Sequence, residues 1–378
     1  MAKKKKVRAE FRKNRTPRTR PTDLTRQFDP QQFDVDRHAR EERIGKDDLT
    51  RRRTIFAESA DSQASDEILL EIDKSLCRPG RVLSVHGLLS AVESSGEVFQ
   101  CATRRLLKTL GTDLRHVVAA GDRVWFRPVE GSTEKEGIIE LVEPRKNVLS
   151  RSVRGRQHVI AANVDQALIV ASAAEPPLKP NLIDRLLVTA EQAHVPPLVC
   201  INKIDLVDPA HLEPLVGVYA RMGYDVLLAS AATGLGMDRL KQRLAGRQTA
   251  IAGQSGVGKS SLLNAIEPGL GLAVAPVSRE TEKGKHTTTV ARLLPLSFGG
   301  YVVDTPGVRQ FQLWDVIPEE VVGLFRDFRP YLNDCRFPDC THTHEADCAV
   351  KDAVADGRLD DRRYESYLRL REEEEAGF

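Results

Sequence analysis

Residues 253–260, Gly-Gln-Ser-Gly-Val-Gly-Lys-Ser, fit the pattern GxxxxGK(S/T) at every position. The apolar run Thr249–Ala252 before them predicts a buried strand, and residues 261–266 after them predict a helix. Glycines at both ends of the segment allow successive backbone N–H groups to point at one anion. Strand, loop and helix in this order are typical of a phosphate-binding loop in a parallel α/β domain, although a glycine-rich turn is the simpler alternative.

Two side chains of this loop suit a bound nucleoside triphosphate. Lys259 is expected to reach the β and γ phosphates, and the Ser260 hydroxyl is expected to bind Mg²⁺. The N-terminus of the following helix adds a partial positive charge close to the phosphates. The loop therefore predicts that the chain binds a nucleotide together with Mg²⁺.

A second polar segment, Asn202-Lys203-Ile204-Asp205, follows the apolar run Pro197–Ile201. It stands where a strand of a nucleotide-binding sheet would end. The Asp205 carboxylate can accept hydrogen bonds from the N1–H and 2-amino groups of guanine, whereas adenine has an acceptor at N1 and no amino group there. The segment therefore predicts selection of guanine, with Asn202 and Lys203 bracing the base and the phosphate loop. A simple turn is the alternative.

The order of these motifs is unusual. Residues 202–205 precede residues 253–260, whereas GTPases of the usual chain order have the phosphate loop first. The order predicts a circularly permuted GTPase. Ser230-Ala231, after the run Val226–Ala229, is where such proteins hold a second loop against the base, and a plain turn explains this pair equally well.

A third motif, Asp304-Thr-Pro-Gly307, follows the apolar residues Tyr301–Val303. Asp304 is expected to hold Mg²⁺ through water, and the Gly307 N–H is expected to contact the γ-phosphate. Many GTPases have a water-orienting glutamine at the next position, but this chain has Val308. Because valine cannot orient water, we expect slow hydrolysis by the chain alone and catalytic help from elsewhere.

The polar segment 278–290 lies between the phosphate loop and Asp304. Its composition is that of a switch in which Thr288 closes on Mg²⁺ when GTP is bound. His286 is a candidate catalytic group, and the alternative for it is an ordinary solvated residue. The threonines could instead simply begin the strand expected at 292–296.

Three of the six cysteines fall within 14 residues of one another, close to a histidine. Three thiolates and one imidazole form a closed tetrahedral site, which is typical of structural zinc. A disulfide is disfavoured, because no signal peptide is present and the nucleotide-binding core is typical of a reducing compartment. His344 is an alternative to His342, and accidental clustering is the simplest alternative. The expected ligands of one structural Zn²⁺ are Cys335, Cys340, His342 and Cys348.

Charge is distributed unevenly along the 378 residues. Residues 1–20 have ten Lys or Arg and one Glu, whereas the remaining residues have 46 basic and 53 acidic side chains. Such a basic segment with few apolar residues is expected to be disordered when free, and it suits the phosphates of nucleic acid. A solubilising tail is the alternative, and a nuclear address is a further one if the source is not bacterial.

Residues 67–146 contain several short strand patterns with glycine-containing turns between them. This pattern predicts a small β-barrel, and an OB-fold would account for its size. Of the adjacent Trp125 and Phe126, one should point into the core and the other outward, where an aromatic beside arginines would suit base stacking. A basic face is expected from Arg104, Arg105, Lys108, Arg115, Arg123 and Arg127.

The C-terminal part of the chain has a different pattern. After Asp304, residues 318–333 and a charged segment from about 356 to 375 predict helices on either side of the cysteine cluster. No apolar run reaches the length of a membrane span, so we expect a soluble protein with no membrane partner.

Together these residues closely resemble the ribosome small subunit dependent GTPase A family, also called RsgA or YjeQ, over roughly residues 67–360. The resemblance rests on the motifs above and on three further ones: Ala161-Ala-Asn-Val-Asp-Gln166, Asn181-Leu-Ile-Asp-Arg185 and Gly284-Lys-His-Thr-Thr-Thr289. Lys285 stands where arginine is common in the family. The resemblance assigns to phosphates and Mg²⁺ the residues Gly253, Gln254, Ser255, Gly256, Val257, Gly258, Lys259, Ser260 and Ser261.

The resemblance implies an OB-fold β-barrel, a central circularly permuted α/β P-loop GTPase domain and a C-terminal helical zinc domain. It implies a cytoplasmic GTP hydrolase that uses GTP/GDP and Mg²⁺ and binds the small ribosomal subunit with its 16S-type rRNA. Hydrolysis, stimulated by the subunit late in its maturation, would release the protein, expected to be a monomer, and another assembly factor. The expected segments are a basic arm (1–66), the OB-fold (67–148), the GTPase domain (149–312) and the zinc domain (313–378).

Two other functions are compatible with parts of the sequence. Permuted GTPases of the large ribosomal subunit share the motif order, but they lack the barrel before the GTPase domain and the zinc cluster after it. An RNA-binding module without meaningful turnover is the other, because Val308 replaces the water-orienting residue.

Overall fold

The computed structural model describes residues 5–10, 52–58, 69–70, 72–104, 107, 117–129, 135–152, 157–272, 291–304 and 320–375. The chain divides into two compact units, Met1–Cys77 and Arg78–Phe378. The predicted active-site residues of the switch segments, His286, Thr288 and Gly307, lie outside the described residues.

The described residues of the first unit form a sheet of three strands. β1 (Lys5–Glu10) pairs antiparallel with β2 (Arg52–Glu58), and β2 pairs with β3 (Leu69–Leu70). The register places Val7 opposite Ile55, which are residues that favour strands. β1 and β2 lie within the segment expected to be a basic arm (1–66), and the other residues of that segment are not described.

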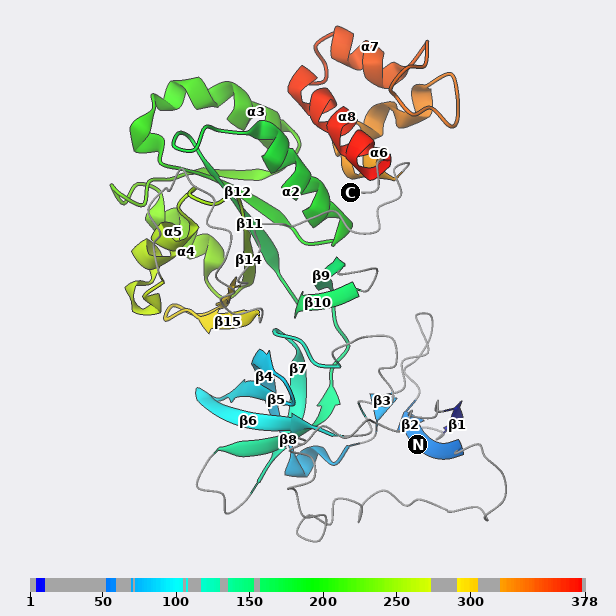
Figure 1. Cartoon of the computed structure of the whole chain (residues 1–378), viewed down its shortest axis with the longest axis vertical. Coiled ribbons are helices and arrows are strands. Elements are labelled where there is room, and N and C mark those ends of the chain that lie inside the picture. Colours follow the sequence, from blue (N-terminus) through cyan, green and yellow to red (C-terminus); the bar gives the residue numbers. More distant parts are fainter. Residues whose placement is uncertain are drawn as a thin grey trace, which may run out of the picture. The chain divides into compact units, whose positions relative to one another are not determined.

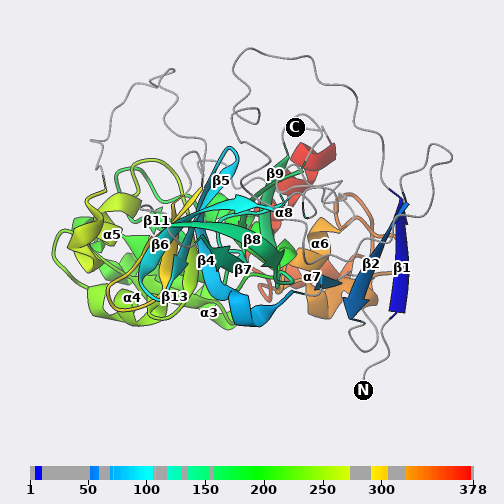
Figure 2. The ribbon, with the colours of Figure 1, turned by 90° about the horizontal axis from the view of Figure 1, so that it is seen from below.

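The second unit begins with a five-stranded barrel. β4 (Arg78–His86), β5 (Leu89–Ser94), β6 (Glu97–Thr103), β8 (Glu136–Val142) and β7 (Arg123–Pro128) are neighbours in that order, and a β4–β7 pairing closes the barrel. Only β6 and β8 run parallel. This topology fits the predicted OB-fold, and its strands are drawn in blue to green in Figure 2.

The alternation of side chains along β7 produces the barrel core. Val124 and Phe126 are buried, whereas Arg123 is exposed and Trp125 is half-buried. The prediction that one of Trp125 and Phe126 points inward and the other outward is confirmed. The inner ring of Phe126 packs on Phe99 with 5.0 Å between the ring centroids.

A hairpin of β9 (Val148–Ser152) and β10 (Gln157–Ala162) connects the barrel with the GTPase sheet. This sheet has the strand order β13-β12-β11-β14-β16-β15. Its strands are β11 (Gln166–Ser172), β12 (Pro197–Asn202), β13 (Asp225–Leu228), β14 (Gln248–Ala252), β15 (Arg292–Pro295) and β16 (Tyr301–Asp304). All neighbours are parallel except β15 and β16.

Helices cover both faces of this sheet (Figure 1). α2 (Pro180–Gln192) and α3 (Glu213–Arg221) pack on one face through residues such as Ile183 and Tyr219. α4 (Met237–Leu244) and α5 (Lys259–Ile266) pack on the other through leucines. Because the sheet is buried on both faces, β11 and β12 are almost continuously apolar.

The C-terminal part is helical, but its helices are shorter than predicted. α6 (Val321–Leu324) and a 3₁₀ helix (Arg329–Asp334) replace one helix over 318–333, because Phe325 adopts an extended conformation between them. α7 (Ala349–Ala355) ends before Gly357, whose φ of 67° stops the helix. The last helix, α8 (Asp361–Glu375), therefore begins five residues later than expected.

A buried ion cluster joins α8 to α2. Arg363 Nη1 donates to Asp184 Oδ1 at 2.7 Å, and Arg363 Nη2 donates to Asp327 Oδ1 at 2.9 Å. The side chains of Arg363 and Asp184 are 2% and 1% exposed. Burial raises the pKa of Asp184, and Arg363 opposes that rise. Val188 of α2 also packs into the apolar core of the C-terminal helices, so α2 and α8 share one interior.

Candidate nucleotide and metal sites

The carboxyl ends of the parallel strands bring the predicted guanine and phosphate motifs to one edge of the sheet. Asn202 ends β12, Ser230 follows β13, and Gly253 follows β14. Asp304 ends β16, the neighbour of β14. The motifs therefore meet at one edge of the sheet, although the guanine motif precedes the phosphate loop along the chain.

The Asp205 carboxylate is exposed at this edge and is oriented by Ser230. The Ser230 hydroxyl donates to Asp205 Oδ1 at 2.5 Å, and Ser230 itself is completely buried. Ile204 turns inward and is buried in the core between β12 and α3. Asp205 thus presents an ionisable acceptor to the outside, which suits the two neighbouring donors of guanine.

Asn202 holds three loops together. Its Nδ2 donates to the Val257 carbonyl of the phosphate loop at 2.9 Å, and its Oδ1 accepts from the Ala231 N–H at 3.2 Å. Asn202 is 1% exposed, so these bonds are shielded from water. The predicted role of Asn202 as a brace corresponds to this geometry.

Lys203 connects the same loops from its own side. Its Nζ donates to the Gly256 carbonyl at 2.9 Å and also to the Glu175 carbonyl. Lys203 has a φ of 61°, a left-handed conformation that is uncommon for a residue with a side chain. The sequence contained no signal for Glu175, because only its backbone oxygen takes part.

The phosphate loop depends on its glycines at two close approaches. A Cβ on Gly253 would lie 2.1 Å from the Val170 carbonyl oxygen, and one on Gly258 would lie 2.3 Å from Asn202 Nδ2. Both residues have positive φ, of 145° and 93°. The loop can therefore form against β11 and Asn202 only with glycine at these positions.

The cationic group of the loop is Lys259, the first residue of α5. Its Nζ donates to the carbonyls of Gly253 and Gln254 at 2.8 Å each, so the ammonium group lies over the loop. Ser255 belongs to the same loop, and Ser260 and Ser261 stand in the first turn of α5. This arrangement of N–H groups, helix N-terminus and ammonium suits a polyphosphate.

Asp304 is half-buried, and burial raises the pKa of its carboxyl while Arg292 opposes the rise. A carboxylate oxygen at this position is a ligand type that suits Mg²⁺, directly or through water. Because β14 and β16 pair in parallel, with Ala250 opposite Val303, Asp304 lies at the same sheet edge as the phosphate loop.

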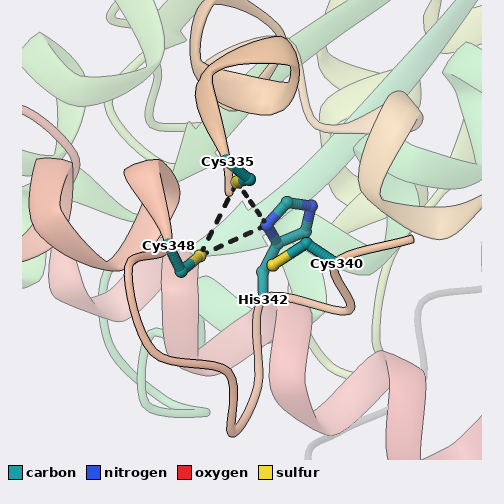
Figure 3. Close-up of side chains that lie close together, drawn as sticks. All are labelled: Cys335, Cys340, His342 and Cys348. Atoms are coloured by element: carbon teal, nitrogen blue, oxygen red, sulfur yellow. Dashed lines mark hydrogen bonds between the residues drawn. The ribbon is translucent and has the colours of Figure 1, made fainter. Parts of the chain in front are cut away.

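The four predicted zinc ligands converge (Figure 3). Their ligand atoms all lie within 4.8 Å of one another. His342 Nδ1 lies 3.4 Å from both Cys335 Sγ and Cys348 Sγ, and these two sulfurs are 3.9 Å apart. A tetrahedral site with Zn–S bonds of about 2.3 Å has sulfur–sulfur distances of about 3.8 Å. The cluster Cys335, Cys340, His342 and Cys348 therefore fits a zinc ion in its donor set and in its size.

The protonation of these ligands is consistent with a cation site. Burial raises the pKa of Cys340 to about 12 and lowers the pKa of His342. The Cys340 thiol consequently needs a nearby cation to become a thiolate, and burial favours the neutral form of His342, which is the form that binds metals. The alternative ligand His344 is exposed, and its Nδ1 pairs with the Thr343 hydroxyl at 3.0 Å.

Tyrosines of α8 hold the backbone around the zinc cluster. The Tyr364 hydroxyl donates to the His342 carbonyl at 2.7 Å, and the Tyr367 hydroxyl donates to the Thr341 carbonyl at 2.6 Å. His342 itself has a φ of 58°. These hydrogen bonds support an unusual backbone conformation at a ligand, which is typical of residues surrounding a metal site.

The predicted basic face of the barrel is described only in part. Arg104 and Arg127 both pair with Glu140, at 3.1 and 3.2 Å, and Arg123 is exposed. The half-buried Trp125 donates from Nε1 to Glu143 at 2.8 Å. The other predicted members of this face, Arg105, Lys108 and Arg115, are outside the described residues.

The profile of the RsgA GTPase family matches residues 142–314. Among curated relatives, a protein of Sodalis glossinidius named "Small ribosomal subunit biogenesis GTPase RsgA" is 44% identical over 299 residues, which are 77% of this chain and 84% of the relative. The chain belongs to the RsgA GTPase family. A protein of the same name from Yersinia enterocolitica is 43% identical over 303 residues, covering 78% of this chain and 84% of the relative.

Solved structures agree with this assignment. The crystal structure of YjeQ from Thermotoga maritima matches with a TM-score of 0.65 and 38% identity, over 79% of this chain and 98% of the other. YloQ, described as a circularly permuted GTPase, matches with a TM-score of 0.61 and 31% identity, over 79% and 94% of the two chains. The predicted barrel, permuted GTPase domain and helical domain with a possible zinc site are confirmed.

Membership of the RsgA GTPase family indicates a GTP hydrolase, and such enzymes require GTP and Mg²⁺. None of the helices in the described part of the chain is long and apolar enough to span a membrane.

Proposed function

We propose that this protein binds the small ribosomal subunit late in the maturation of that subunit and hydrolyses GTP there to GDP and phosphate. Hydrolysis is slow in the free protein and is stimulated by the subunit. The protein acts in the cytoplasm as a monomer, and hydrolysis releases it and another assembly factor from the subunit. The names of the two relatives support the choice of this subunit, since the match with this chain spans 84% of the length of each relative.

The observation that carries the proposal is the connection between the guanine-reading and phosphate-binding loops. Asn202 and Lys203 each donate to a carbonyl of the phosphate loop, at 2.9 Å in both cases. Asp205, beside them, is oriented by Ser230. One chain segment therefore positions a guanine-specific acceptor relative to a polyphosphate site, as GTP requires.

Mg²⁺ would be held by the Ser260 and Thr288 hydroxyls and, through water, by Asp304. When bound, the ion neutralises the charge that develops on the transferred phosphoryl group. The Gly307 N–H would contact the γ-phosphate, and His286 is the proposed catalytic side chain. Val308 cannot orient water, which is why we expect the subunit to complete the active site.

The barrel and the zinc domain, in this proposal, contact ribosomal RNA of the 16S type. On the barrel, Glu140 holds Arg104 and Arg127 side by side, and each guanidinium retains further donors for phosphate oxygens. In the C-terminal domain, one Zn²⁺ at Cys335, Cys340, His342 and Cys348 would stabilise the fold, since the four ligands leave no open position for catalysis. The proposed domains are 67–148, 149–312 and 313–378, after the arm at 1–66.

Binding to purified subunits tests this proposal. The protein is mixed with small or large subunits in the presence of GDP or a non-hydrolysable GTP analogue, and co-sedimentation is measured. We expect retention on the small subunit only, with the analogue favoured over GDP. Asp205→Asn serves as the nucleotide-binding control and should not show the difference between nucleotides. Retention on the large subunit alone, or on neither subunit, would contradict the proposal.

A further inference from the structure

The strands that lead to the phosphate loop and to Asp304 begin side by side at the barrel. Gln248 is the first residue of β14 and Tyr301 is the first residue of β16, and the two are paired in the parallel register. β15, the neighbour of β16, pairs in turn with barrel strand β4 through Arg292 and Ser84. Both first residues use their side chains to bind groups of the barrel or its connection.

Gln248 is completely buried and every polar atom of its side chain is bonded. Its Nε2 donates to the Ala162 carbonyl at 2.7 Å, and its Oε1 accepts from Arg81 Nη1 of β4 at 3.2 Å. The turn before barrel strand β7 closes tightly over it, since a Cβ on Gly121 would lie 2.3 Å from Gln248 Nε2. A buried amide with these partners fixes the start of β14 against the barrel.

Tyr301 makes the corresponding contact from β16. Its hydroxyl donates to Glu93 Oε2 of β5, and the guanidinium carbon of Arg81 lies 4.8 Å from the centre of its ring. Arg81 and Glu93 are themselves opposite each other in the β4–β5 register. Burial and, to a smaller extent, the hydrogen bond to Glu93 raise the pKa of Tyr301 to about 12. The phenol therefore keeps its proton and remains a donor at neutral pH.

These contacts lie at the opposite ends of β14 and β16 from the nucleotide. β14 ends at Ala252, immediately before Gly253, and β16 ends at Asp304. A strand paired on both sides behaves as a rigid element over four or five residues. A displacement of the barrel that moves Gln248 relative to Tyr301 would consequently change the alignment of the phosphate loop relative to Asp304.

We infer that Gln248 and Tyr301 are positioning residues for GTP hydrolysis, through which the barrel controls the alignment of the phosphate loop and Asp304. The barrel side of this contact consists of Arg81 and Glu93. The inference rests on the proposed function, because the signal that it transmits is the docking of the barrel on the small ribosomal subunit. Both residues stand at the ends of β14 and β16 away from the proposed nucleotide site, so we expect their effect on the stimulated rate.

Conservative variants can separate this role from folding and from binding. Tyr301→Phe and Glu93→Gln each weaken one hydrogen bond with little change of volume, and Arg81→Met removes the donor to Gln248 and the cation over the ring. Controls are Tyr224→Phe, whose buried hydroxyl has no hydrogen-bond partner among the described residues, and Arg78→Met, an exposed arginine of β4. Thermal melting checks that all variants are folded.

For each full-length variant, the basal hydrolysis rate, the rate with saturating small subunits and the affinity for the subunit are measured. We expect the ratio of stimulated to basal rate to fall about fivefold or more in Tyr301→Phe, Glu93→Gln and Arg81→Met, which we call the junction variants. Fivefold is about the lower end of ordinary coupling between sites. Basal rate and affinity should stay within about twofold of the unsubstituted protein. The double variant with Glu93→Gln and Tyr301→Phe should lose no more than Tyr301→Phe alone, because both changes act on the same bond.

Full stimulation in the junction variants would overturn the inference and leave the proposed function intact. An equal fall in basal and stimulated rates, or a loss explained by weaker subunit binding, would also overturn it, since the residues would then support folding or contact RNA. If the unsubstituted protein shows no stimulation, the proposed function fails, and the inference fails with it.

Discussion

The Ser230 hydroxyl donates to Asp205 Oδ1 at 2.5 Å, which joins the loop after β13 to the loop after β12. The bond leaves the second carboxylate oxygen and the remaining lone pairs of Asp205 available at the exposed edge of the sheet. Since Ser230 is completely buried, its hydroxyl cannot turn freely to water. The geometry thus orients Asp205 before any base is bound, which reduces the entropic cost of binding.

Replacing Asp205 by Asn should abolish the preference for guanine nucleotides. The amide offers one acceptor oxygen and places donors against the donors of guanine, so two charge-assisted hydrogen bonds are lost or weakened. We expect a loss of about 3 kcal/mol, roughly 150-fold in the Kd for GDP, measured by titration with a fluorescent GDP. The control is Asp208→Asn, three residues along, whose side chain accepts from the Ala210 N–H at the start of a 3₁₀ helix. A loss below tenfold for Asp205→Asn would argue against base recognition by this residue.

The two histidines of the cysteine cluster should behave differently. His342→Ala removes a ligand atom that lies 3.4 Å from two sulfurs, so the purified variant should contain less zinc and melt at a lower temperature. His344→Ala, at an exposed side chain, should keep about one zinc per chain. Zinc content by mass spectrometry after mild chelation decides the matter. Equal zinc retention by both variants would exclude His342 as a ligand.

Arg363 should be important for stability because it is the only cation in the cluster with Asp184 and Asp327 among the residues described. Arg363→Met leaves the buried Asp184 and the half-buried Asp327 without this partner, which is expected to lower the free energy of unfolding by about 3–5 kcal/mol. Arg369→Met on the same helix removes only an exposed pair with Glu365 and should cost at most about 1 kcal/mol. Urea unfolding of both variants measures the difference, and similar losses would show that the buried cluster adds nothing.

A pH dependence is expected at Glu267, which follows α5. Hydrogen bonds from the Ser297 hydroxyl and N–H lower the pKa of Glu267 below its ordinary value of 4.5. A carboxyl group whose pKa is lowered by folding stabilises the fold above that ordinary value and loses this effect as the pH falls through the folded-state pKa. At pH 7 the protein should therefore have a higher melting temperature than the Glu267→Gln variant. The difference between the two melting temperatures should disappear as the pH falls below about 4.5. A difference that persists unchanged at pH 3 would mean that the charge of Glu267 contributes nothing.

Much of the GTPase domain could be predicted from the sequence because its sheet is covered on both faces. β12 extends over Pro197–Asn202, close to the apolar run Pro197–Ile201, and all seven residues of its neighbour β11 are buried. The motifs at strand ends were similarly accessible, since each polar cluster follows an apolar run. Parallel pairing then places these clusters at one edge whatever their order along the chain.

Other features left no pattern to read. β5 (Leu89–Ser94) has little apolar alternation, because two of the three residues that it buries, Ser90 and Ser94, are polar. The Ser94 hydroxyl donates to the Pro79 carbonyl. The break between α6 and the 3₁₀ helix arises from tertiary packing. Phe325 and Phe328 both enter the core with 5.0 Å between their ring centroids. The local sequence pattern over 318–333 does not indicate that the helix breaks at Phe325.

The interactions between distant segments were also inaccessible to sequence analysis. The Glu175 carbonyl that accepts from Lys203 is a backbone atom, for which any residue would serve. Asp184 and Arg363 are 179 positions apart, and nothing in either local pattern indicates that they pair. Such contacts depend on the packing of complete elements.

The central claim is that the small ribosomal subunit activates GTP hydrolysis by this protein. The most direct test is the steady-state rate of phosphate release from GTP by the purified full-length chain alone, with small subunits and with large subunits. The account predicts a slow rate for the free protein and a rise of about tenfold or more with small subunits only. An unchanged rate with small subunits, or a rise with large subunits alone, would contradict it.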